Sequence, residues 1–390
     1  MARSRGRHRT LTSVAGSLAL LVGTVLVGAG APAQAQPPPT LRELAAAQGL
    51  HLGAAVAGPP TLADPTYREV LTREFSMGTS ENDMKWGPIH PAPDTYAFAN
   101  ADAQAALLAD NAMAMRGHNL AWHMQNPDWL TSGTWTRDEA IGLLEDHIDA
   151  VAARYAGRIV EWDVVNEAVG LGDDPWPNPW SASIGYPDYL DVAFHRARLA
   201  DPSAQLFYND FGIELANPRA DAVYDLVRGM VDRGVPIDGV GFQAHLSVDS
   251  CPTPISCTDG LLTEMARYEA LGLRVSITEL DVAIPLPADA DELARQADVY
   301  RQVVLACLWA PNCDTVVLWG VSDAHSWIPG FRPGWGAALL LDEQYRPKPA
   351  YDAVAALLAD PPARPAPTTT VPASPTTVAP AAQVTPAFTG

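Results

Sequence analysis

Short apolar segments alternate with longer segments of helical period from residue 50 onward, about eight times in succession. The apolar and β-branched segments predict strands at 52–56, 74–79, 113–119, 159–165, 205–209, 238–244, 274–280 and 315–319. The segments between them predict helices, several opened by Asp, Asn or Thr at a capping position, at 100–110, 136–154, 188–200, 217–233, 259–271 and 290–308. This alternation predicts a parallel sheet covered by helices, and eight units close into a single (β/α)8 TIM barrel.

An open, doubly wound sheet is the alternative fold. No glycine-rich phosphate loop of the G-x-G-x-x-G or Walker type follows any predicted strand, so the sequence gives this alternative no support. No short internal repeat is visible, and we expect one domain over residues 41–358.

The first 35 residues have the pattern of a secretory signal peptide. Four arginines lie within the first ten residues, an apolar run follows from Leu11, and Ala33-Gln34-Ala35 has small residues at cleavage spacing. A retained membrane anchor is the alternative, because the glycine-interrupted run is nearly long enough to span a bilayer. The prolines that follow the small-residue site favour removal, and we expect a protein secreted to the extracellular medium.

Residues 359–390 differ in composition from the rest of the chain. They are rich in Pro, Thr and Ala and cannot bury enough apolar surface to order themselves, so they predict a disordered, extended linker or tail.

The four cysteines form two local pairs with a spacing of six, Cys251 with Cys257 and Cys307 with Cys313. Four cysteines allow three connectivities, and in a secreted chain the two local disulfides are the favoured pairing. A zinc site is the alternative, although CxxC spacing is absent.

Charge restricts the partners of the protein. The chain has 45 acidic and 25 basic residues, a formal net charge of −20, which repels phosphate backbones and anionic lipid. We therefore expect no nucleic acid and, after removal of the leader, no membrane as partner. Eleven tryptophans suggest flat ligands with apolar faces, such as sugars.

Polar and aromatic side chains gather where the predicted strands end. The loops at the carboxyl ends of barrel strands converge on one pocket, so these side chains are expected to meet there. Glu167 and Glu279 each end a strongly apolar strand. One carboxylic acid and one carboxylate in a cleft rich in amides and indoles are what glycosidic cleavage requires.

Other residues at the strand ends have alternative interpretations. His118, His123 and His245 could ligate zinc, but hydrogen bonding to sugar hydroxyls or to a carboxylate is favoured. Lys85, one of only two lysines in the chain, suits sugar hydroxyls. The tryptophans at the strand ends could be core residues, but the walls of a saccharide cleft are favoured for Trp86, Trp122, Trp319 and Trp327.

With these motifs in order, the chain resembles the family 10 glycoside hydrolases, secreted endo-1,4-β-xylanases, over about residues 45–355. The resemblance rests on Glu81-Asn82-x-x-Lys85-Trp86, Arg116-Gly117-His118, Trp122-His123 with Gln125, Trp162 to Glu167, Gly241 to His245, Thr278 to Asp281, Trp319-Gly320 and Lys348 to Tyr351. The Cys307 and Cys313 pair also resembles a disulfide of that family.

The resemblance implies a retaining mechanism with no metal and no cofactor. Glu167 would be the general acid/base and Glu279 the nucleophile, in a monomer that binds β-1,4-xylan and xylo-oligosaccharides. His245 with Asp281 would keep the nucleophile ionised, while Gln243 and Asn209 would support the acid/base side. The other implied contacts are Asn166, His118, Trp122, Lys85 and Trp319 around the sugar that is cleaved, Glu81, Asn82, Gln125 and Trp327 around the next sugar, and His123 in support.

The sequence departs from the family pattern on the leaving-group side. Phe211-Gly212 replaces the usual Tyr-Asn, and the two tryptophans of loop 173–180 are unusual, so we expect altered leaving-group contacts. A separate and milder departure is Asp83, which stands where the family usually has Glu. A barrel β-glucanase is an alternative function, which differs in whether the cleft admits a C5 hydroxymethyl group. A carbohydrate-binding protein without activity is another, and the presence of both glutamates argues against it.

Overall fold

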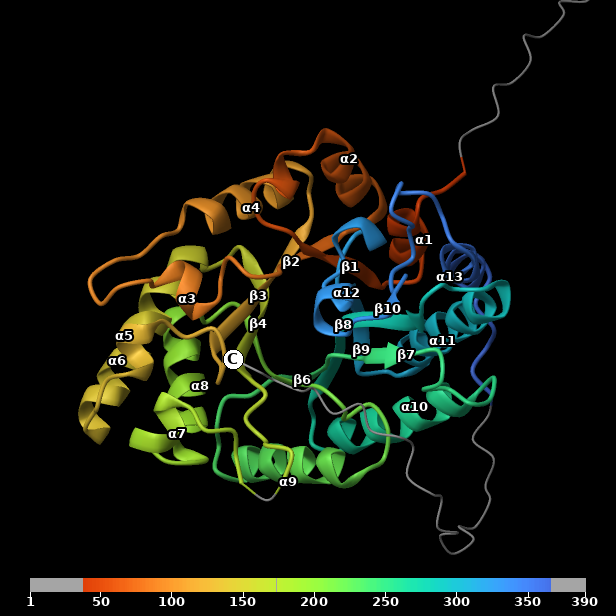
Figure 1. Cartoon of the computed structure of the whole chain (residues 1–390). Coiled ribbons are helices and arrows are strands. Elements are labelled where there is room, and N and C mark those ends of the chain that lie inside the picture. Colours follow the sequence, from red (N-terminus) through yellow and green to blue (C-terminus); the bar gives the residue numbers. More distant parts are fainter. Residues whose placement is uncertain (1–37, 173, 366–390) are drawn as a thin grey trace, which may run out of the picture. The chain divides into compact units, whose positions relative to one another are not determined.

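Eight parallel strands surrounded by helices form the body of the protein (Figure 1). The computed structural model describes residues 38–172 and 174–365, so the predicted leader and the tail from residue 366 lie outside the described residues. The barrel strands are β1 (His51–Val56), β2 (Met77–Ser80), β3 (Ala114–Ala121), β4 (Ile159–Asn166), β5 (Gln205–Asp210), β6 (Gly239–Phe242), β8 (Arg274–Pro285) and β9 (Cys313–Leu318).

Each strand pairs in parallel with the next, and β9 pairs with β1 to close the ring, with His51 opposite Thr315. The (β/α)8 prediction is therefore confirmed. The longer helices are α1 (Leu41–Ala47), α2 (Pro65–Glu74), α4 (Ala99–Asp110), α6 (Arg137–Ala152), α8 (Asp188–Ala200), α9 (Pro218–Asp232), α10 (Ser256–Glu269), α11 (Ala290–Trp309) and α13 (Pro349–Ala359). Short helices are α3 (Trp86–Ile89), α5 (Asp128–Thr131), α7 (Pro179–Ser183) and α12 (Ile328–Phe331).

Capping side chains begin several of these helices. Thr136 and Asp289 form capping boxes at the starts of α6 and α11, and Asn217 caps α9 just before a proline at its first turn. These caps satisfy backbone N–H groups that have no partner within the helix. They agree with the capping signals predicted from sequence.

Two strand boundaries differ from the prediction in a way that matters for the site. The predicted strand 238–244 ends at Phe242, because Ala244 adopts a left-handed backbone with φ 59°, and the chain resumes as the short strand β7 (His245–Ser247). β8 continues past residue 280 to Pro285, where it pairs with β7 and with β10 (Trp335–Gly336). His245 consequently lies opposite Asp281.

A buried cation lies inside the barrel. Arg116, which has no exposed surface, forms ion pairs with Glu161 and Asp163. A buried guanidinium requires such partners, because an unpaired charge in the core would be strongly destabilising.

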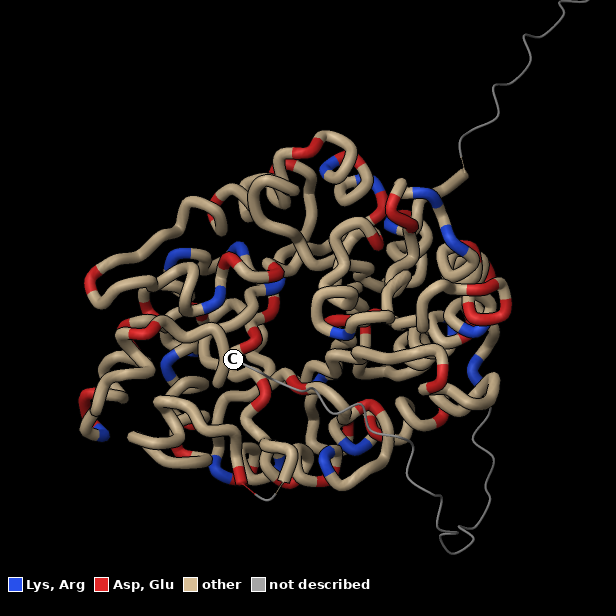
Figure 2. The backbone as a smooth tube through the Cα atoms, in the orientation of Figure 1, with Lys and Arg blue, Asp and Glu red and all other residues tan. Residues whose placement is uncertain are grey.

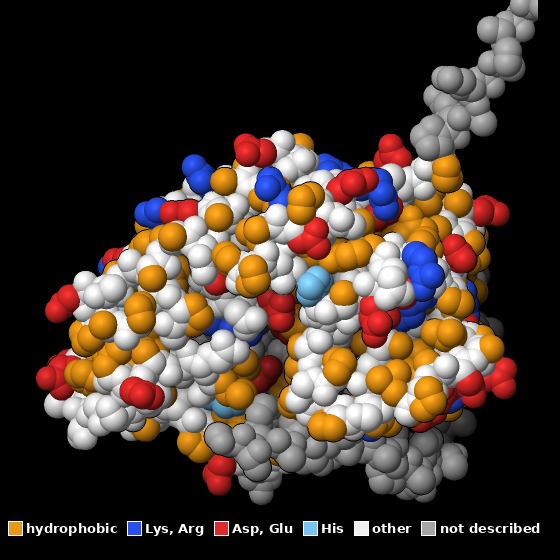
Figure 3. Space-filling model, turned by 45° about the horizontal axis from the view of Figure 1, so that its top comes forward, with side chains coloured by type: hydrophobic (Ala, Val, Ile, Leu, Met, Phe, Trp, Pro, Cys, Tyr) orange, Lys and Arg blue, Asp and Glu red, His pale blue; other side chains and the backbone are white. Residues whose placement is uncertain are grey.

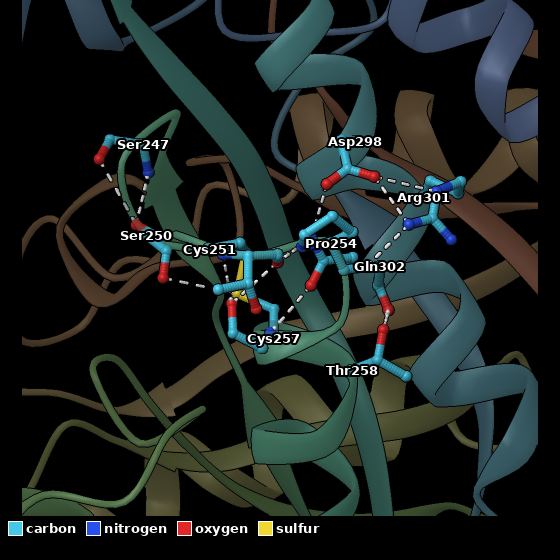
Figure 4. Close-up of a disulfide and its surroundings, with 11 residues drawn as sticks. Ser247, Ser250, Cys251, Pro254, Cys257, Thr258, Asp298, Arg301 and Gln302 are labelled. Atoms are coloured by element: carbon cyan, nitrogen blue, oxygen red, sulfur yellow. Dashed lines mark hydrogen bonds and ion pairs between the residues drawn. A yellow bond between two sulfur atoms is a disulfide. The ribbon is translucent and has the colours of Figure 1, made fainter.

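Both predicted local disulfides, Cys251–Cys257 and Cys307–Cys313, are present. The first closes the loop that follows β7 (Figure 4). Gln302 of α11 fastens this loop, since its amide donates to Thr253 O at 2.9 Å and its carbonyl accepts from Cys257 N at 2.9 Å. The loop after His245 is thus attached to an outer helix.

Acidic and basic positions are intermixed around the outer helices (Figure 2). Many of them form exposed ion pairs, such as Arg233 with Asp191 and Arg154 with Asp102. Among the described residues, no helix combines the length and the apolar character that a membrane crossing needs.

Candidate active site

Two buried glutamates lie at the carboxyl end of the barrel. Glu167 follows β4 directly and is 7% exposed, and Glu279 belongs to β8 and is 4% exposed. The face of the protein drawn in Figure 3 is hollowed near its centre, where acidic side chains gather.

Glu167 accepts hydrogen bonds from two side chains. Trp122 Nε1 donates to Oε2 at 2.9 Å and Gln243 Nε2 donates to Oε1 at 2.9 Å, while His123 Nδ1 lies 3.8 Å from Oε2. Burial, reinforced by the negative charge of Asp210, raises the pKa of Glu167 to about 7, although the two hydrogen bonds act in the opposite direction. A carboxyl group with this pKa holds a proton at weakly acidic pH and can release it.

Glu279 has a different environment. Asn209 Nδ2 donates to Oε1 at 2.8 Å, His245 Nε2 lies 3.2 Å from Oε2, and His118 Nδ1 lies 3.9 Å from Oε1. Burial alone would raise the pKa of Glu279, but the hydrogen bond from His245 and the charges of the two imidazoles lower it below its ordinary value. Glu279 is therefore ionised where Glu167 is protonated.

His245 is held between two carboxylates. Its Nδ1 lies 3.1 Å from Asp281 Oδ2, which also accepts from Trp327 Nε1 at 2.8 Å. Burial opposes the charge on His245, but Asp281 and Glu279 outweigh it and raise the pKa of His245 to about 10. Both ring nitrogens of the charged imidazole are donors, so His245 can donate hydrogen bonds to Asp281 and Glu279 at the same time.

An amide network joins the two glutamates. Asn166 Oδ1 accepts from Asn209 Nδ2 at 2.9 Å and from Gln243 Nε2 at 3.2 Å. The sequence predicts that Asn209 supports Glu167, and its contacts agree with this only in part. Its backbone carbonyl does accept from Glu167 N at 2.9 Å, but its side chain donates to Glu279.

Lys85, Asn82, Gln125 and Trp122 lie together beside the glutamates. Asn82 Oδ1 accepts from Lys85 Nζ at 3.1 Å and from Gln125 Nε2 at 3.4 Å, and Lys85 Nζ lies 5.0 Å from the centre of the Trp122 ring. Burial lowers the pKa of Lys85 and raises the pKa of Glu81, and the attraction between the two groups opposes both shifts. Trp327, predicted with Asn82 and Gln125 to contact the next sugar, donates through Nε1 to Asp281 Oδ2 at 2.8 Å.

His118 is oriented by the buried ion pair of the barrel interior. Its Nδ1 lies 2.9 Å from Asp163 Oδ2, and the Trp319 ring packs edge-on against His118 at 5.2 Å and against His245 at 6.3 Å. The zinc alternative is not supported by this arrangement, because carboxylates lie at both ring nitrogens of His245 and at Nδ1 of His118. Within residues 38–172 and 174–365, no group of three or more His, Cys, Asp or Glu side chains is arranged to hold a metal ion.

The tryptophans separate into core and cleft residues. The prediction that Trp86 lines the cleft is wrong, because its indole is 1% exposed, donates to Leu120 O and stacks on His147 at 3.6 Å. Of the two tryptophans in loop 173–180, Trp180 is buried against Trp86, so only Trp176 lies at the site, stacked on His123 at 5.0 Å.

Two further residues contact the backbone that follows Glu167, and a third binds both of them. Tyr208 and Arg219 make the backbone contacts, and Asp210 accepts hydrogen bonds from both side chains. The sequence patterns do not single out these three residues as site residues. Tyr208 and Asp210 follow the strand-end rule, since they lie at the end of β5, but Arg219 lies on α9 and carries no such signal.

A parallel barrel with one protonated and one ionised glutamate at its mouth is the arrangement of a glycoside hydrolase. Comparison with known proteins agrees. The family model described as Glycosyl hydrolase family 10 matches residues 40–357.

Endo-1,4-beta-xylanase B of Thermotoga neapolitana is 39% identical over 322 residues, which cover 82% of this chain and 91% of that protein. Endo-1,4-beta-xylanase 5 of Pyricularia oryzae is 38% identical over 354 residues, 88% of this chain and 86% of that protein. The crystal structure of xylanase 10B from Thermotoga petrophila RKU-1 in complex with xylobiose superposes with a TM-score of 0.79 and 39% identity, over 83% of this chain and 98% of that one. The chain belongs to glycosyl hydrolase family 10 and is an enzyme of that family.

Proposed function

We propose that the protein is an endo-acting β-1,4-xylanase that retains the anomeric configuration, with Glu167 as general acid/base and Glu279 as nucleophile. The observation that carries the proposal is the pair of buried glutamates at the mouth of the barrel, Glu167 bonded by Trp122 and Gln243 and Glu279 bonded by Asn209 and His245. These surroundings shift the two pKa values in opposite directions, upward for Glu167 and downward for Glu279. Two neighbouring carboxyl groups that differ in this way are suited to one protonation and one attack.

In the first step, a Glu279 oxygen attacks the anomeric carbon and the bond to the leaving oxygen breaks. Glu167 gives its proton to that oxygen, so the departing sugar leaves as an alcohol and a glycosyl ester of Glu279 remains. His245 and Asn209 hold the attacking carboxylate. Asn166, whose Oδ1 accepts from the side chains of Asn209 and Gln243, would contact the 2-hydroxyl of the sugar.

In the second step, water attacks the same carbon from the side that the leaving group vacated. The ester has removed the negative charge from Glu279, which is one of the charges that raise the pKa of Glu167. Glu167 is then a stronger acid, so its carboxylate is available to accept the proton of the water. Glu279 is released as a carboxylate and Glu167 is protonated again.

The relatives support xylan as substrate. Solved structures similar to this chain include complexes with xylobiose, xylotriose and xylotetraose. The side chains that would bind the sugars on the glycone side are Lys85, Asn82, Gln125, Glu81, Trp122, His118, Trp319 and Trp327. Lys85 and Asn82 present an ammonium and an amide that hydroxyl groups can bond, and the indoles present flat faces to the sugar rings.

We also propose that the protein acts outside the cell as a monomer. The signal-peptide pattern of residues 1–35 and the two disulfides support secretion, because disulfides persist in oxidising compartments.

The test is incubation of the protein with soluble β-1,4-xylan and, in parallel, with carboxymethyl-cellulose, following new reducing ends and product sizes. Xylo-oligosaccharides of several lengths from the wild type, and none from Glu279→Gln, are expected. Activity on carboxymethyl-cellulose alone would mean that the substrate is a β-glucan and not xylan, and the proposed mechanism would still hold. Activity on neither polymer would refute the proposal.

A further inference from the structure

Tyr208 contacts the backbone that follows the proposed acid/base. Its hydroxyl oxygen accepts from Ala168 N at 3.0 Å and Val169 N at 3.4 Å, and its hydroxyl proton is donated to Asp210 Oδ2 at 2.5 Å. Tyr208 and Asp210 have no exposed surface. Asp210 therefore fixes the orientation of the hydroxyl that binds the first two N–H groups after Glu167.

Arg219 contacts the same turn from α9. Its Nη2 donates to Asp210 Oδ1 at 2.6 Å, its Nη1 donates to Gly170 O at 2.7 Å, and its Nε donates to Phe211 O at 2.9 Å. The guanidinium carbon lies 4.1 Å from the centre of the Phe211 ring. We call Tyr208, Asp210 and Arg219 the acid-loop cluster, because together they bind three consecutive residues after Glu167.

The backbone at Glu167 needs such support. Glu167 has φ 54°, in the left-handed region that costs a residue other than glycine about 1–3 kcal/mol. The hydrogen bond from Glu167 N to Asn209 O holds one side of this residue, and the acid-loop cluster holds the other. The conformation aims the carboxyl group at Trp122 and Gln243.

Asp210 also brings negative charge to Glu167. The charged or titratable groups that face Glu167 are His123 after β3, Lys85 after β2, Glu279 on β8, Asp210 on β5 and Arg219 on α9. Among these groups, Asp210 has the largest effect on the pKa of Glu167, and it acts upward. Burial and the charge of Arg219 lower the pKa of His123 to about 4, so His123 adds no cation beside Glu167 near neutral pH.

We propose that Asp210, held by Tyr208 and Arg219, is a positioning residue that fixes the turn after Glu167 and keeps this glutamate protonated for transfer to the leaving sugar. The inference rests on the proposed function, because it assigns Asp210 a role only if Glu167 is the acid. It goes beyond the two-glutamate mechanism by giving control of the acid to a carboxylate that does not contact substrate.

The test is the pH profile of kcat/KM for Asp210→Asn on a xylo-oligosaccharide. Asparagine keeps an acceptor for Tyr208 but removes the negative charge and leaves Arg219 as an unpaired cation, and both changes favour ionised Glu167. The alkaline limb of the profile should therefore move to lower pH by at least about 0.5 unit. This shift lowers kcat/KM at pH 8, relative to the plateau at acid pH, at least about threefold.

Glu264→Gln is the matched control. Glu264 is a 2% exposed carboxylate on α10, paired with Arg267 at 2.7 Å, and it lies outside the cleft. Its loss should lower stability and leave the alkaline limb unchanged. If Asp210→Asn is folded and active and its alkaline limb stays at the wild-type position, the ion pair of Asp210 and Arg219 is merely structural. The proposal is then overturned.

A double variant, Asp210→Asn with Arg219→Met, covers the case in which the single variant does not fold. It buries no unpaired charge, and because Asp210 acts more strongly on Glu167 than Arg219 does, the limb should still move downward. A limb at the wild-type position, or loss of folding in this variant too, would overturn the proposal. Failure of the wild type to cleave xylan would instead overturn the proposed function and the inference with it, whereas failure of the inference alone leaves wild-type cleavage intact.

Discussion

Replacing Glu167 by Gln is expected to stabilise the protein progressively, relative to wild type, as the pH rises from 4 to 8. The pKa of Glu167 is about 7 in the folded protein, against an ordinary value of 4.5. A carboxyl group with a raised pKa favours folding fully below its unfolded pKa, and this contribution is lost as the pH rises through the folded pKa. Wild type therefore loses it between about pH 4.5 and 7, whereas Glu167→Gln does not.

The magnitude follows from the difference between the two pKa values, which is 2.5 units on the values above. At about 1.36 kcal/mol per unit, the free energy of unfolding of Glu167→Gln minus that of wild type should increase by about 3 kcal/mol between pH 4 and pH 8. The glutamine also replaces one acceptor by an NH2 group, opposite either Trp122 or Gln243. That loss costs the same at every pH, so it cancels from the difference between the two pH values.

The assay is urea unfolding followed by tryptophan fluorescence at both pH values. Glu279→Gln is the control, because it makes the same chemical change at a carboxylate whose pKa is lowered. Glu279 contributes stability above its unfolded pKa, and this contribution is lost as the pH falls through the folded pKa. The Glu279→Gln difference should therefore change in the opposite direction. A Glu167→Gln difference that is equal at pH 4 and pH 8 would refute the reasoning.

Three further substitutions test the hydrogen bonding of Glu167 and the packing of the protein. Trp122→Phe removes a donor to Glu167 Oε2, so the alkaline limb of kcat/KM should move upward by as much as about one pH unit; a pH profile on a xylo-oligosaccharide measures this, and an unmoved limb would contradict it. Gly117→Ala would place its Cβ 2.1 Å from the Trp162 ring, and should lose at least about 2 kcal/mol in urea unfolding. Gly142→Ala in α6, where nothing lies within 4 Å of the added Cβ, should gain about 0.5–1 kcal/mol, and equal stability of the two variants would be the contrary result.

The barrel could be predicted from sequence because short apolar or β-branched segments, buried in the structure, recur between longer segments of helical period. All eight predicted strands are present in the structure. The run ends at Leu280 in the prediction because Asp281 interrupts it. In the structure the strand continues, since the carboxylate of Asp281 is bonded by His245 and Trp327. A polar residue inside a strand was therefore mistaken for its end.

The positions of the glutamates could also be predicted, but not all of their partners. Residue type and strand-end position are sufficient to place Glu167 and Glu279 at the mouth of the barrel. The hydrogen-bond partners of the two glutamates depend on the left-handed backbone at Glu167 and at Ala244. No local sequence pattern predicts this conformation at either residue. Trp86 shows the same limit, because an indole beside a strand end can turn inward as easily as toward the cleft.

The amides of the site do not distinguish the two glutamates. Asn209 and Gln243 both donate to Asn166, and each donates in addition to one glutamate, at 2.8 Å and 2.9 Å. Because each glutamate accepts one hydrogen bond from a side-chain amide, these amides fix the positions of the two carboxyl groups. They do not favour ionisation of one glutamate over the other.

The difference between the glutamates must therefore come from charge. Glu279 has the imidazoles of His245 and His118 within 4 Å, at 3.2 and 3.9 Å. Glu167 has an imidazole at a similar distance, 3.8 Å, but burial and Arg219 keep His123 neutral near pH 7. The charged imidazole of His245 thus favours ionised Glu279, whereas neutral His123 and the negative charge of Asp210 favour protonated Glu167. On this argument, a cation introduced beside Glu167 would lower the pKa of Glu167, so that this glutamate would lose the proton that it has to donate. The contacts of Glu279 would stay the same.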